Sequence, residues 1–183
     1  MKNNKSLAEP NDVLYRIKRG LAGYVSYLAA CEMNESFSEY VLYEPILRIL
    51  TARGYKVKCE VVCLGIEQPR VGDKKKLDFV ASLDNLTFAL EVKWAKNARP
   101  KIDEDLLKLA ACRRENNWQS FLCVFGTESN IVNIQVPVSL KERGQCVIAQ
   151  FGKTRFGCRI YELTEQAAAL NSCDMPVESA SLN

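Results

Sequence analysis

The segment LDFVASLDNLTFALEVK, residues 77–93, decides how this chain folds. Its apolar residues alternate with other residues on both sides of Asp84-Asn85, which is typical of two strands joined by a two-residue turn. With that turn, one face of the hairpin carries apolar residues alone and belongs against a core. The opposed pairs on this face are Leu77/Val92, Phe79/Leu90, Ala81/Phe88 and Leu83/Leu86.

The same register places two carboxylates, Asp78 and Glu91, opposite each other on the second face, with Cβ atoms about 5 Å apart. Like charges so close are destabilising unless a cation lies between them or one carboxyl is protonated. Mg²⁺ meets this need, because it prefers oxygen ligands and binds one or two carboxylates together with water and phosphate. Lys93 follows Glu91 by two residues, so strand alternation puts its amine on the same face. There it can hold or deprotonate an attacking water, or stabilise the phosphorus centre under attack.

Composition narrows the chemistry further. The chain of 183 residues has no histidine, which excludes Ser-His-Asp hydrolysis, Cys-His proteases, histidine-based nucleases and zinc sites built on imidazole. The net charge is +3, from 25 basic and 22 acidic residues, so a polyanion must be attracted by local clusters. The eight cysteines include no Cys-x-x-Cys pair, and we expect them to be reduced and mostly buried.

Periodicity and capping signals predict an α/β fold, with helices flanking a central mixed sheet, in one domain. The expected helices run from Asn11 or Asp12 towards Asn34, from Ser36 or Ser38 to Gly54 with a bend at Pro45, over residues 103–117, and over 164–170. The expected strands lie in KVKCEVVCL, KLDFVAS, LTFALEVKW, WQSFLCVFG, QCVIAQFG and FGCRIYEL. We expect residues 1–34 to form a helical extension packed on the core, 35–170 the main domain, and 171–183 a flexible tail.

The arrangement of Asp78, a twelve-residue gap, and Glu91-x-Lys93 resembles the PD-(D/E)XK nuclease superfamily over residues 36–126. Leu77 stands where the name of the superfamily has proline. The resemblance implies a restriction-endonuclease-like central mixed β-sheet flanked by helices, and Mg²⁺-dependent hydrolysis of phosphodiesters, with Mn²⁺ able to substitute. Asp78, Glu91 and the Val92 carbonyl would hold one Mg²⁺ or two, and Lys93 would orient the attacking water.

Members of this superfamily commonly add an acid from the first core helix. Helical projection puts Glu39 in the middle of the apolar arc and Glu44 on the opposite side, which favours Glu39 as a catalytic and metal-binding residue. Capping of the helix start explains Glu39 equally well, and a kink at Pro45 keeps Glu44 a candidate. Glu60, on the strand before the hairpin, is a third candidate, although a solvated edge position accounts for it equally well.

Two basic stretches flank the hairpin, Lys74, Lys75 and Lys76 before it and Lys96, Arg99 and Lys101 after it. Beside a metal site they suit contact with a phosphate backbone. We therefore expect a metal-dependent nuclease that acts on nucleic acid, with DNA favoured over RNA only because the superfamily mostly acts on DNA. A homodimer would suit cleavage of both strands.

Two further hypotheses are compatible with the sequence. One is an inactive nuclease-like domain that binds nucleic acid or protein, and the other is an interaction protein whose acids and lysine form salt bridges on a solvated strand. No segment has the roughly 20 apolar residues needed to span a bilayer, and the first twelve residues lack an apolar signal, so we expect a cytoplasmic protein with no membrane partner.

Overall fold

The computed structural model describes residues 10–33 and 38–164, which form an α/β fold around a mixed, open sheet of seven strands. The strands are β1 (Lys56–Val62), β2 (Lys76–Leu83), β3 (Leu86–Ala95), β4 (Gln119–Thr127), β5 (Leu140–Glu142), β6 (Val147–Ala149) and β7 (Phe156–Leu163). Their order is β1-β2-β3-β4-β7-β5, with β6 also paired to β7. The β3–β4 pair is parallel and the others are antiparallel. The general fold class predicted from the sequence is thus confirmed.

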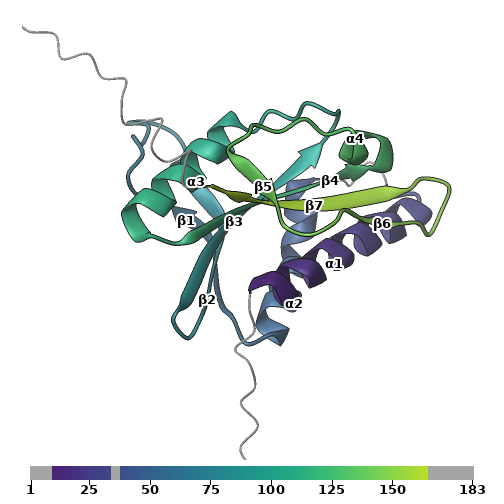
Figure 1. Cartoon of the computed structure of the whole chain (residues 1–183), viewed down its shortest axis with the longest axis horizontal. Coiled ribbons are helices and arrows are strands. Elements are labelled where there is room, and N and C mark those ends of the chain that lie inside the picture. Colours follow the sequence, from purple (N-terminus) through teal and green to yellow (C-terminus); the bar gives the residue numbers. More distant parts are fainter. Residues whose placement is uncertain (1–9, 34–37, 165–183) are drawn as a thin grey trace, which may run out of the picture.

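Helices cover both faces of this sheet (Figure 1). On one face lie α1 (Pro10–Ala30) and the pair formed by a 3₁₀ turn, η2 (Glu39–Leu42), and α2 (Tyr43–Ala52). On the other face lie α3 (Asp103–Asn116) and α4 (Glu128–Val132). Because parallel strands need a long crossover, α3 supplies the connection between β3 and β4.

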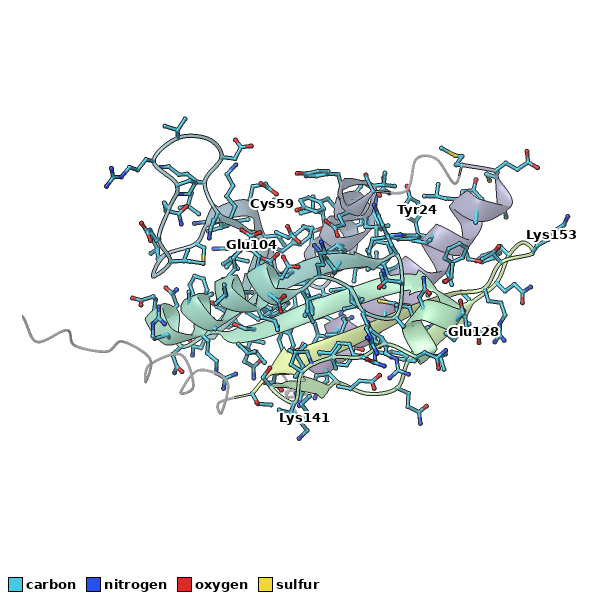
Figure 2. The ribbon with its side chains drawn as sticks, turned by 90° about the horizontal axis from the view of Figure 1, so that it is seen from above. Tyr24, Cys59, Glu104, Glu128, Lys141 and Lys153 are labelled. Carbon is cyan, nitrogen blue, oxygen red and sulfur yellow. The ribbon has the colours of Figure 1, made fainter. Side chains whose placement is uncertain are left out.

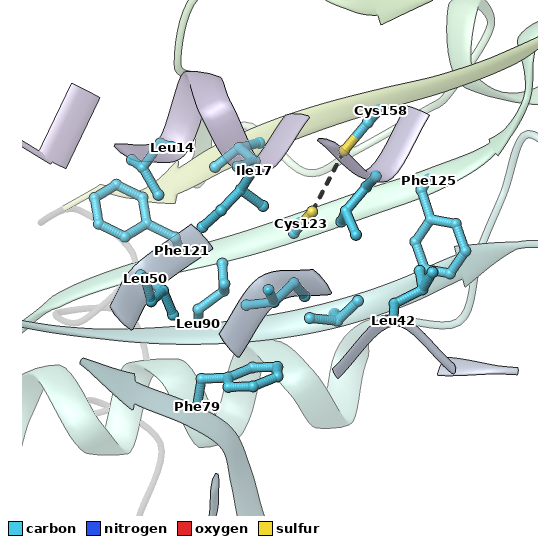
Figure 3. Packing of buried hydrophobic residues seen from close by; sticks show 14 of the residues in the cluster. Leu14, Ile17, Leu42, Leu50, Phe79, Leu90, Phe121, Cys123, Phe125 and Cys158 are labelled. Atoms are coloured by element: carbon cyan, nitrogen blue, oxygen red, sulfur yellow. Dashed lines mark hydrogen bonds between the residues drawn. The ribbon is translucent and has the colours of Figure 1, made fainter. Parts of the chain in front are cut away.

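Each face of the sheet has its own apolar core. Figure 3 shows the first core. In it, Leu14 and Ile17 of α1, Leu42 of η2 and Leu50 of α2 meet side chains of β2, β3, β4 and β7. The second core joins Leu109 and Cys112 of α3 to the opposite face of the same strands. Strand β4 is buried along nearly its whole length, as expected for a central strand whose sequence is a continuous apolar run.

The hairpin has the predicted register from Leu83/Leu86 to Phe79/Leu90, and its turn lies at Asp84-Asn85, where Asp84 has a φ of 51°. One detail of the prediction is wrong. Leu77 packs in the second core beside α3, whereas Val92 packs in the first core, so the apolar face does not extend to the Leu77/Val92 pair. The two strands part at this point, and Asp78 lies where they separate.

Most predicted elements are present, with differences at their ends. The first helix ends at Ala30 and not near Asn34, and the second begins as a 3₁₀ turn that becomes an α-helix at Tyr43, two residues before Pro45. The predicted stop at Gly54 is confirmed, because its φ of 85° is the left-handed conformation that ends helices. The short segments α4 and β5 were not predicted. The predicted cap at Ser36, the helix beyond Thr164 and the tail lie outside the described residues.

Helix α1 is fixed to the sheet by an unusual contact as well as by apolar packing. Lys18 is 1% exposed, and its Nζ donates hydrogen bonds of 2.7 Å to the backbone carbonyls of Arg143 and Gln145, in the loop between β5 and β6. Burial lowers the pKa of Lys18. Because two backbone carbonyls accept hydrogen bonds from its amine, we interpret this lysine as a structural tie between the helix and the loop.

The described cysteines are all free, and four of the seven are buried, in agreement with the sequence prediction. Cys123 of β4 and Cys158 of β7 lie with their sulfur atoms 3.4 Å apart inside the first core. Over residues 10–33 and 38–164, no helix combines the length and the apolar character needed to cross a bilayer.

The contact between β3 and β4 gives a test of the packing. A Cβ on Gly126 would lie 2.8 Å from the backbone oxygen of Ala95, its neighbour in the parallel ladder, whereas a Cβ on Gly23 in α1 would meet nothing closer than 4.0 Å. We expect Gly126→Ala to lower the free energy of unfolding by about 1–3 kcal/mol, because backbone atoms must shift. Gly23→Ala, the control, should raise it by about 0.5–1 kcal/mol. Urea unfolding of both variants measures the difference, and a neutral Gly126→Ala would contradict this close approach of the two strands.

Candidate functional site

Asp78 lies at the point where β2 and β3 separate, and it ties three elements together. One carboxylate oxygen accepts a hydrogen bond of 2.7 Å from the amide of Val92 in β3, and the other accepts one of 2.6 Å from the hydroxyl of Tyr43 in α2. Burial raises the pKa of Asp78, although both hydrogen bonds oppose this shift. Val92, whose carbonyl was predicted as a metal ligand, thus contacts Asp78 through its amide.

Glu91 is the most buried acid of the described residues, with 1% of its surface exposed. Its Oε2 accepts a hydrogen bond of 2.6 Å from Nζ of Lys108 in α3, while its Oε1 is buried without a hydrogen-bond partner among the described residues. Burial, reinforced by the Asp78 carboxylate, raises the pKa of Glu91 to about 9. The hypothesis of a solvated strand is therefore wrong for Glu91.

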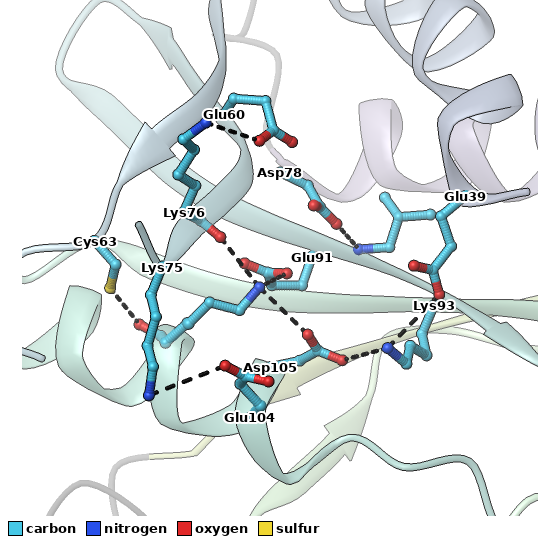
Figure 4. Close-up of polar contacts among 12 residues, drawn as sticks. Glu39, Glu60, Cys63, Lys75, Lys76, Asp78, Glu91, Lys93, Glu104 and Asp105 are labelled. Atoms are coloured by element: carbon cyan, nitrogen blue, oxygen red, sulfur yellow. Dashed lines mark hydrogen bonds and ion pairs between the residues drawn. The ribbon is translucent and has the colours of Figure 1, made fainter. Parts of the chain in front are cut away.

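Lys93 lies on the same side as Glu91, between two acids from different elements (Figure 4). Its Nζ is 3.2 Å from Oδ2 of Asp105 in α3 and 3.6 Å from Oε1 of Glu39 in η2. Burial alone would lower the pKa of Lys93, but the Asp105 and Glu39 carboxylates outweigh it, so the pKa is raised. The amine therefore stays protonated at neutral pH, which favours a role in orienting or charge stabilisation over one as a base.

The three candidate acids outside the hairpin occupy different positions. Glu39 contacts Lys93 and accepts a hydrogen bond of 3.0 Å from the Trp94 amide, so it lies at the site. Glu44 is exposed and pairs with Arg48 on its own helix. Glu60, at the outer side of the site, accepts a hydrogen bond from the Tyr43 hydroxyl that also contacts Asp78, and its Oε2 is 3.6 Å from Nζ of Lys76.

Two site residues, Asp105 and Lys108 of α3, were not predicted from the sequence. Lys108 contacts Glu91, the Lys76 carbonyl at 3.1 Å and Asp105 at 3.3 Å. A signal for Asp105 exists in the sequence. Ile102, Asp105, Leu109 and Cys112 share one helical stripe, and an acid at the centre of a buried stripe is costly unless it is paired. The physical reason that favours Glu39 therefore holds for Asp105 as well.

The two predicted basic stretches differ in their surroundings. Lys75 and Lys76 lie near acids, 4.0 Å from Glu104 and 3.6 Å from Glu60, whereas Lys74 is exposed. Lys96, Arg99 and Lys101 are also exposed, and no carboxylate of the described residues lies within 4 Å of them. The stretch after the hairpin therefore keeps more unpaired positive charge than the stretch before it.

The composition of the cluster is compatible with a divalent cation. Five carboxyl groups (Glu39, Glu60, Asp78, Glu91 and Asp105) adjoin three amines (Lys76, Lys93 and Lys108). One negative charge is in excess while Glu91 keeps its proton, and two are in excess when all groups are ionised. Oε1 of Glu91 is buried without a hydrogen-bond partner among the described residues. In the described part of the chain, no three acidic, cysteine or histidine side chains converge as a metal-binding group. Two carboxylates with a carbonyl are the smaller donor set that Mg²⁺ accepts.

The chain was compared with protein-family models, curated proteins and solved structures, and none of the three comparisons gave a match.

The raised pKa of Glu91 predicts a pH dependence of stability. In the fold this carboxyl keeps its proton up to a pH of about 9, whereas in the unfolded chain it ionises near its ordinary value, so its contribution to stability falls as the pH rises between the two values. Glu91→Gln removes this titration. In the absence of metal, we expect the free energy of unfolding of the variant to improve relative to the unaltered protein by up to about 1.4 kcal/mol per pH unit between pH 5 and 9.

Urea unfolding at pH 5.5 and pH 8 measures this difference. Glu104→Gln is the matched control. This carboxylate belongs to α3, the helix that contacts Glu91, but its side chain is 69% exposed. A pH-independent difference for Glu91→Gln would mean that Glu91 is ionised in the fold throughout the range.

Proposed function

We propose that this protein is a metal-dependent nuclease that hydrolyses phosphodiester bonds of nucleic acid with Mg²⁺. The observation that carries the proposal is the convergence of Asp78, Glu91 and Lys93 where β2 and β3 separate, with a buried, unpartnered oxygen on Glu91. The sequence resemblance to the PD-(D/E)XK superfamily supports it, as do the mixed sheet and its flanking helices. In this proposal the fold is restriction-endonuclease-like.

Asp78, Glu91 and the Val92 carbonyl would hold the ion, with Glu39 acting directly or through water. When bound, the ion would neutralise charge on a phosphoryl oxygen and lower the pKa of bound water. Lys93, held by Asp105 and Glu39 and protonated, would orient the attacking water and stabilise negative charge on the phosphate. Tyr43 would fix the Asp78 carboxylate through its hydrogen bond of 2.6 Å.

Nucleic acid fits the charges around this cluster. Lys74, Lys75 and Lys76 lie at one end of β2, and Lys96, Arg99 and Lys101 follow the end of β3 that carries Lys93. A phosphate backbone that crosses the acids would meet positive charge on both sides. DNA remains the favoured substrate on the strength of the superfamily resemblance alone, so both DNA and RNA belong in the assay.

Metal binding and cleavage give the first test of the proposal. We expect Mg²⁺ or Mn²⁺ to raise the free energy of unfolding by about 2.7 kcal/mol at one hundred times the dissociation constant, and Asp78→Asn to abolish this gain. We also expect cleavage of plasmid or single-stranded substrates to need the ion, and Lys93→Ala to slow cleavage at least about 100-fold. Lys141→Ala, at an exposed lysine of β5, is the control. Equal cleavage by the Lys93→Ala variant would reject the chemistry.

One contact favours a second candidate function, a nuclease-like domain that binds nucleic acid without cutting. Nζ of Lys108 lies 2.6 Å from Glu91, where a cation bound by that carboxylate would also lie. Burial alone would lower the pKa of Lys108, but its contacts with Glu91 and Asp105 outweigh burial and raise the pKa, so the amine is protonated at neutral pH. In this candidate Lys108 replaces the metal. In the nuclease, Glu91 would hold the ion, and Lys108 would remain paired with Asp105, which lies 3.3 Å from its Nζ in this structure.

Lys108→Met separates the two candidates. Without metal the variant should lose about 1–3 kcal/mol of stability, because buried Glu91 and the Lys76 carbonyl lose the hydrogen bonds that Lys108 donates. If the nuclease proposal is right, the unaltered protein is stabilised by Mn²⁺ and the variant binds Mn²⁺ at least about tenfold more tightly, since the competing amine is gone. If Lys108 replaces the metal, the unaltered protein shows no Mn²⁺ effect and the variant alone acquires one. Thermal unfolding across a Mn²⁺ titration distinguishes these outcomes.

A further inference from the structure

A cavity of about 510 Å³ opens beside Lys93, and neither Glu91 nor Lys108 lines it. We call it the basic cavity, and the lining residues that matter here are Glu39, Lys93, Trp94, Lys96, Arg99 and Lys101. It is lined by the end of β3, by the segment that leads from β3 into α3, and by the start of η2. Its volume falls within the range of about 300–1,000 Å³ that is typical of small-ligand sites.

The charges of this cavity favour an anion. Four cationic side chains and one carboxylate, that of Glu39, line the cavity. The Glu39 carboxylate already contacts Lys93 and accepts a hydrogen bond from the Trp94 amide. Lys96, Arg99 and Lys101 have no carboxylate within 4 Å in the described part of the chain. Arg99 is held in place, because its Nε donates a hydrogen bond of 2.9 Å to Oε1 of Gln135 and its amide donates one to Asn97. Its Nη groups take no part in these bonds, and a fixed guanidinium suits phosphate geometry.

The size of the cavity indicates which kind of anion it can hold. Stacked and paired bases of a duplex present a broad surface, and a single base enters a cavity of this size only after leaving the stack. An unpaired nucleotide brings both the phosphate that the cations attract and the sugar and base that fill the volume. Lys93 belongs both to the cavity and to the acidic cluster, so the occupant of one is adjacent to the other.

We propose that the basic cavity is a nucleotide subsite, which receives one unpaired nucleotide next to the bond that is cut and so selects single strands or strand ends over intact duplex. This inference rests on the proposed function, because only a nuclease cuts a bond next to the bound nucleotide. Binding of the nucleotide itself needs neither metal nor cleavage, because the residues that hold it lie outside the pair Asp78 and Glu91.

Fluorescence of Trp94 tests the subsite in the full chain with EDTA present. The other tryptophan, Trp118, is replaced by Phe so that the signal reports on the cavity. The ligands are the 5′-phosphorylated dinucleotide pTpT, thymidine without phosphate, a blunt duplex, and inorganic phosphate. We expect pTpT to change the Trp94 signal saturably, and thymidine, duplex and inorganic phosphate to bind at least about tenfold more weakly.

The variant for this test is the double substitution Lys96→Ala and Lys101→Ala, which we expect to weaken pTpT at least about tenfold. The matched control removes two exposed lysines elsewhere, Lys141→Ala and Lys153→Ala, and should bind as the unaltered protein does. Figure 2 shows these two lysines well away from Glu104 at the start of α3. All four positions are exposed, so thermal unfolding should be unchanged in both double variants.

Three results would overturn the subsite. They are duplex binding as tight as pTpT, inorganic phosphate competing as well as pTpT, or equal affinities in the two double variants. None of them bears on whether Mg²⁺ binds Asp78 and Glu91. Conversely, if metal has no effect on stability but pTpT binds as expected, the nuclease proposal fails and the nucleotide subsite stands as part of a binding domain.

Discussion

A carboxylate buried under a helix requires a proton or a positive charge beside it, and Glu91 imposes this requirement on the whole site. It lies on β3 at 1% exposure, with α3 packed over it. Lys108 supplies the charge to one oxygen, and burial raises the pKa of the carboxyl to about 9. The neighbouring contacts follow from this arrangement. Asp105 contacts both Lys108 and Lys93, and Lys93 also contacts Glu39 (Figure 4).

The fold brings these groups together because the hairpin opens at one end. From Leu83/Leu86 to Phe79/Leu90, β2 and β3 form an ordinary antiparallel ladder. Beyond Phe79/Leu90, the carboxylate of Asp78 accepts a hydrogen bond from the amide of Val92. Tyr43 then connects α2 to the same carboxylate. Helices from opposite faces of the sheet, α2 and α3, therefore meet the hairpin at one point. This convergence is what allows a small sheet to place five acids and three lysines around one opening.

The charges divide the site into two parts that share Lys93. On one side lie acids whose pKa values are raised by burial, an environment that favours a bound cation. On the other side lie exposed cations around the basic cavity, an environment that favours phosphate. Opposite charges adjacent to each other in this way suit a substrate that is an anion and a cofactor that is a cation. In the nuclease proposed above, the metal and the nucleotide would therefore be neighbours.

The sequence by itself determined the local features of this protein. Alternation fixed the hairpin register from Leu83/Leu86 to Phe79/Leu90, because this pattern repeats within the two strands. Helical projection chose Glu39 over Glu44, and Glu39 does lie at the site, but in a 3₁₀ turn that precedes the α-helix of Glu44 and not on one helix with it. The tertiary structure alone decided which distant groups meet. The pairing of Lys108 with Glu91, the hydroxyl of Tyr43 between Asp78 and Glu60, and the packing of Leu77 on the second core depend on how helices cross the sheet. Such contacts join residues that no short-range pattern relates, since their distance is set by the packing of separate elements.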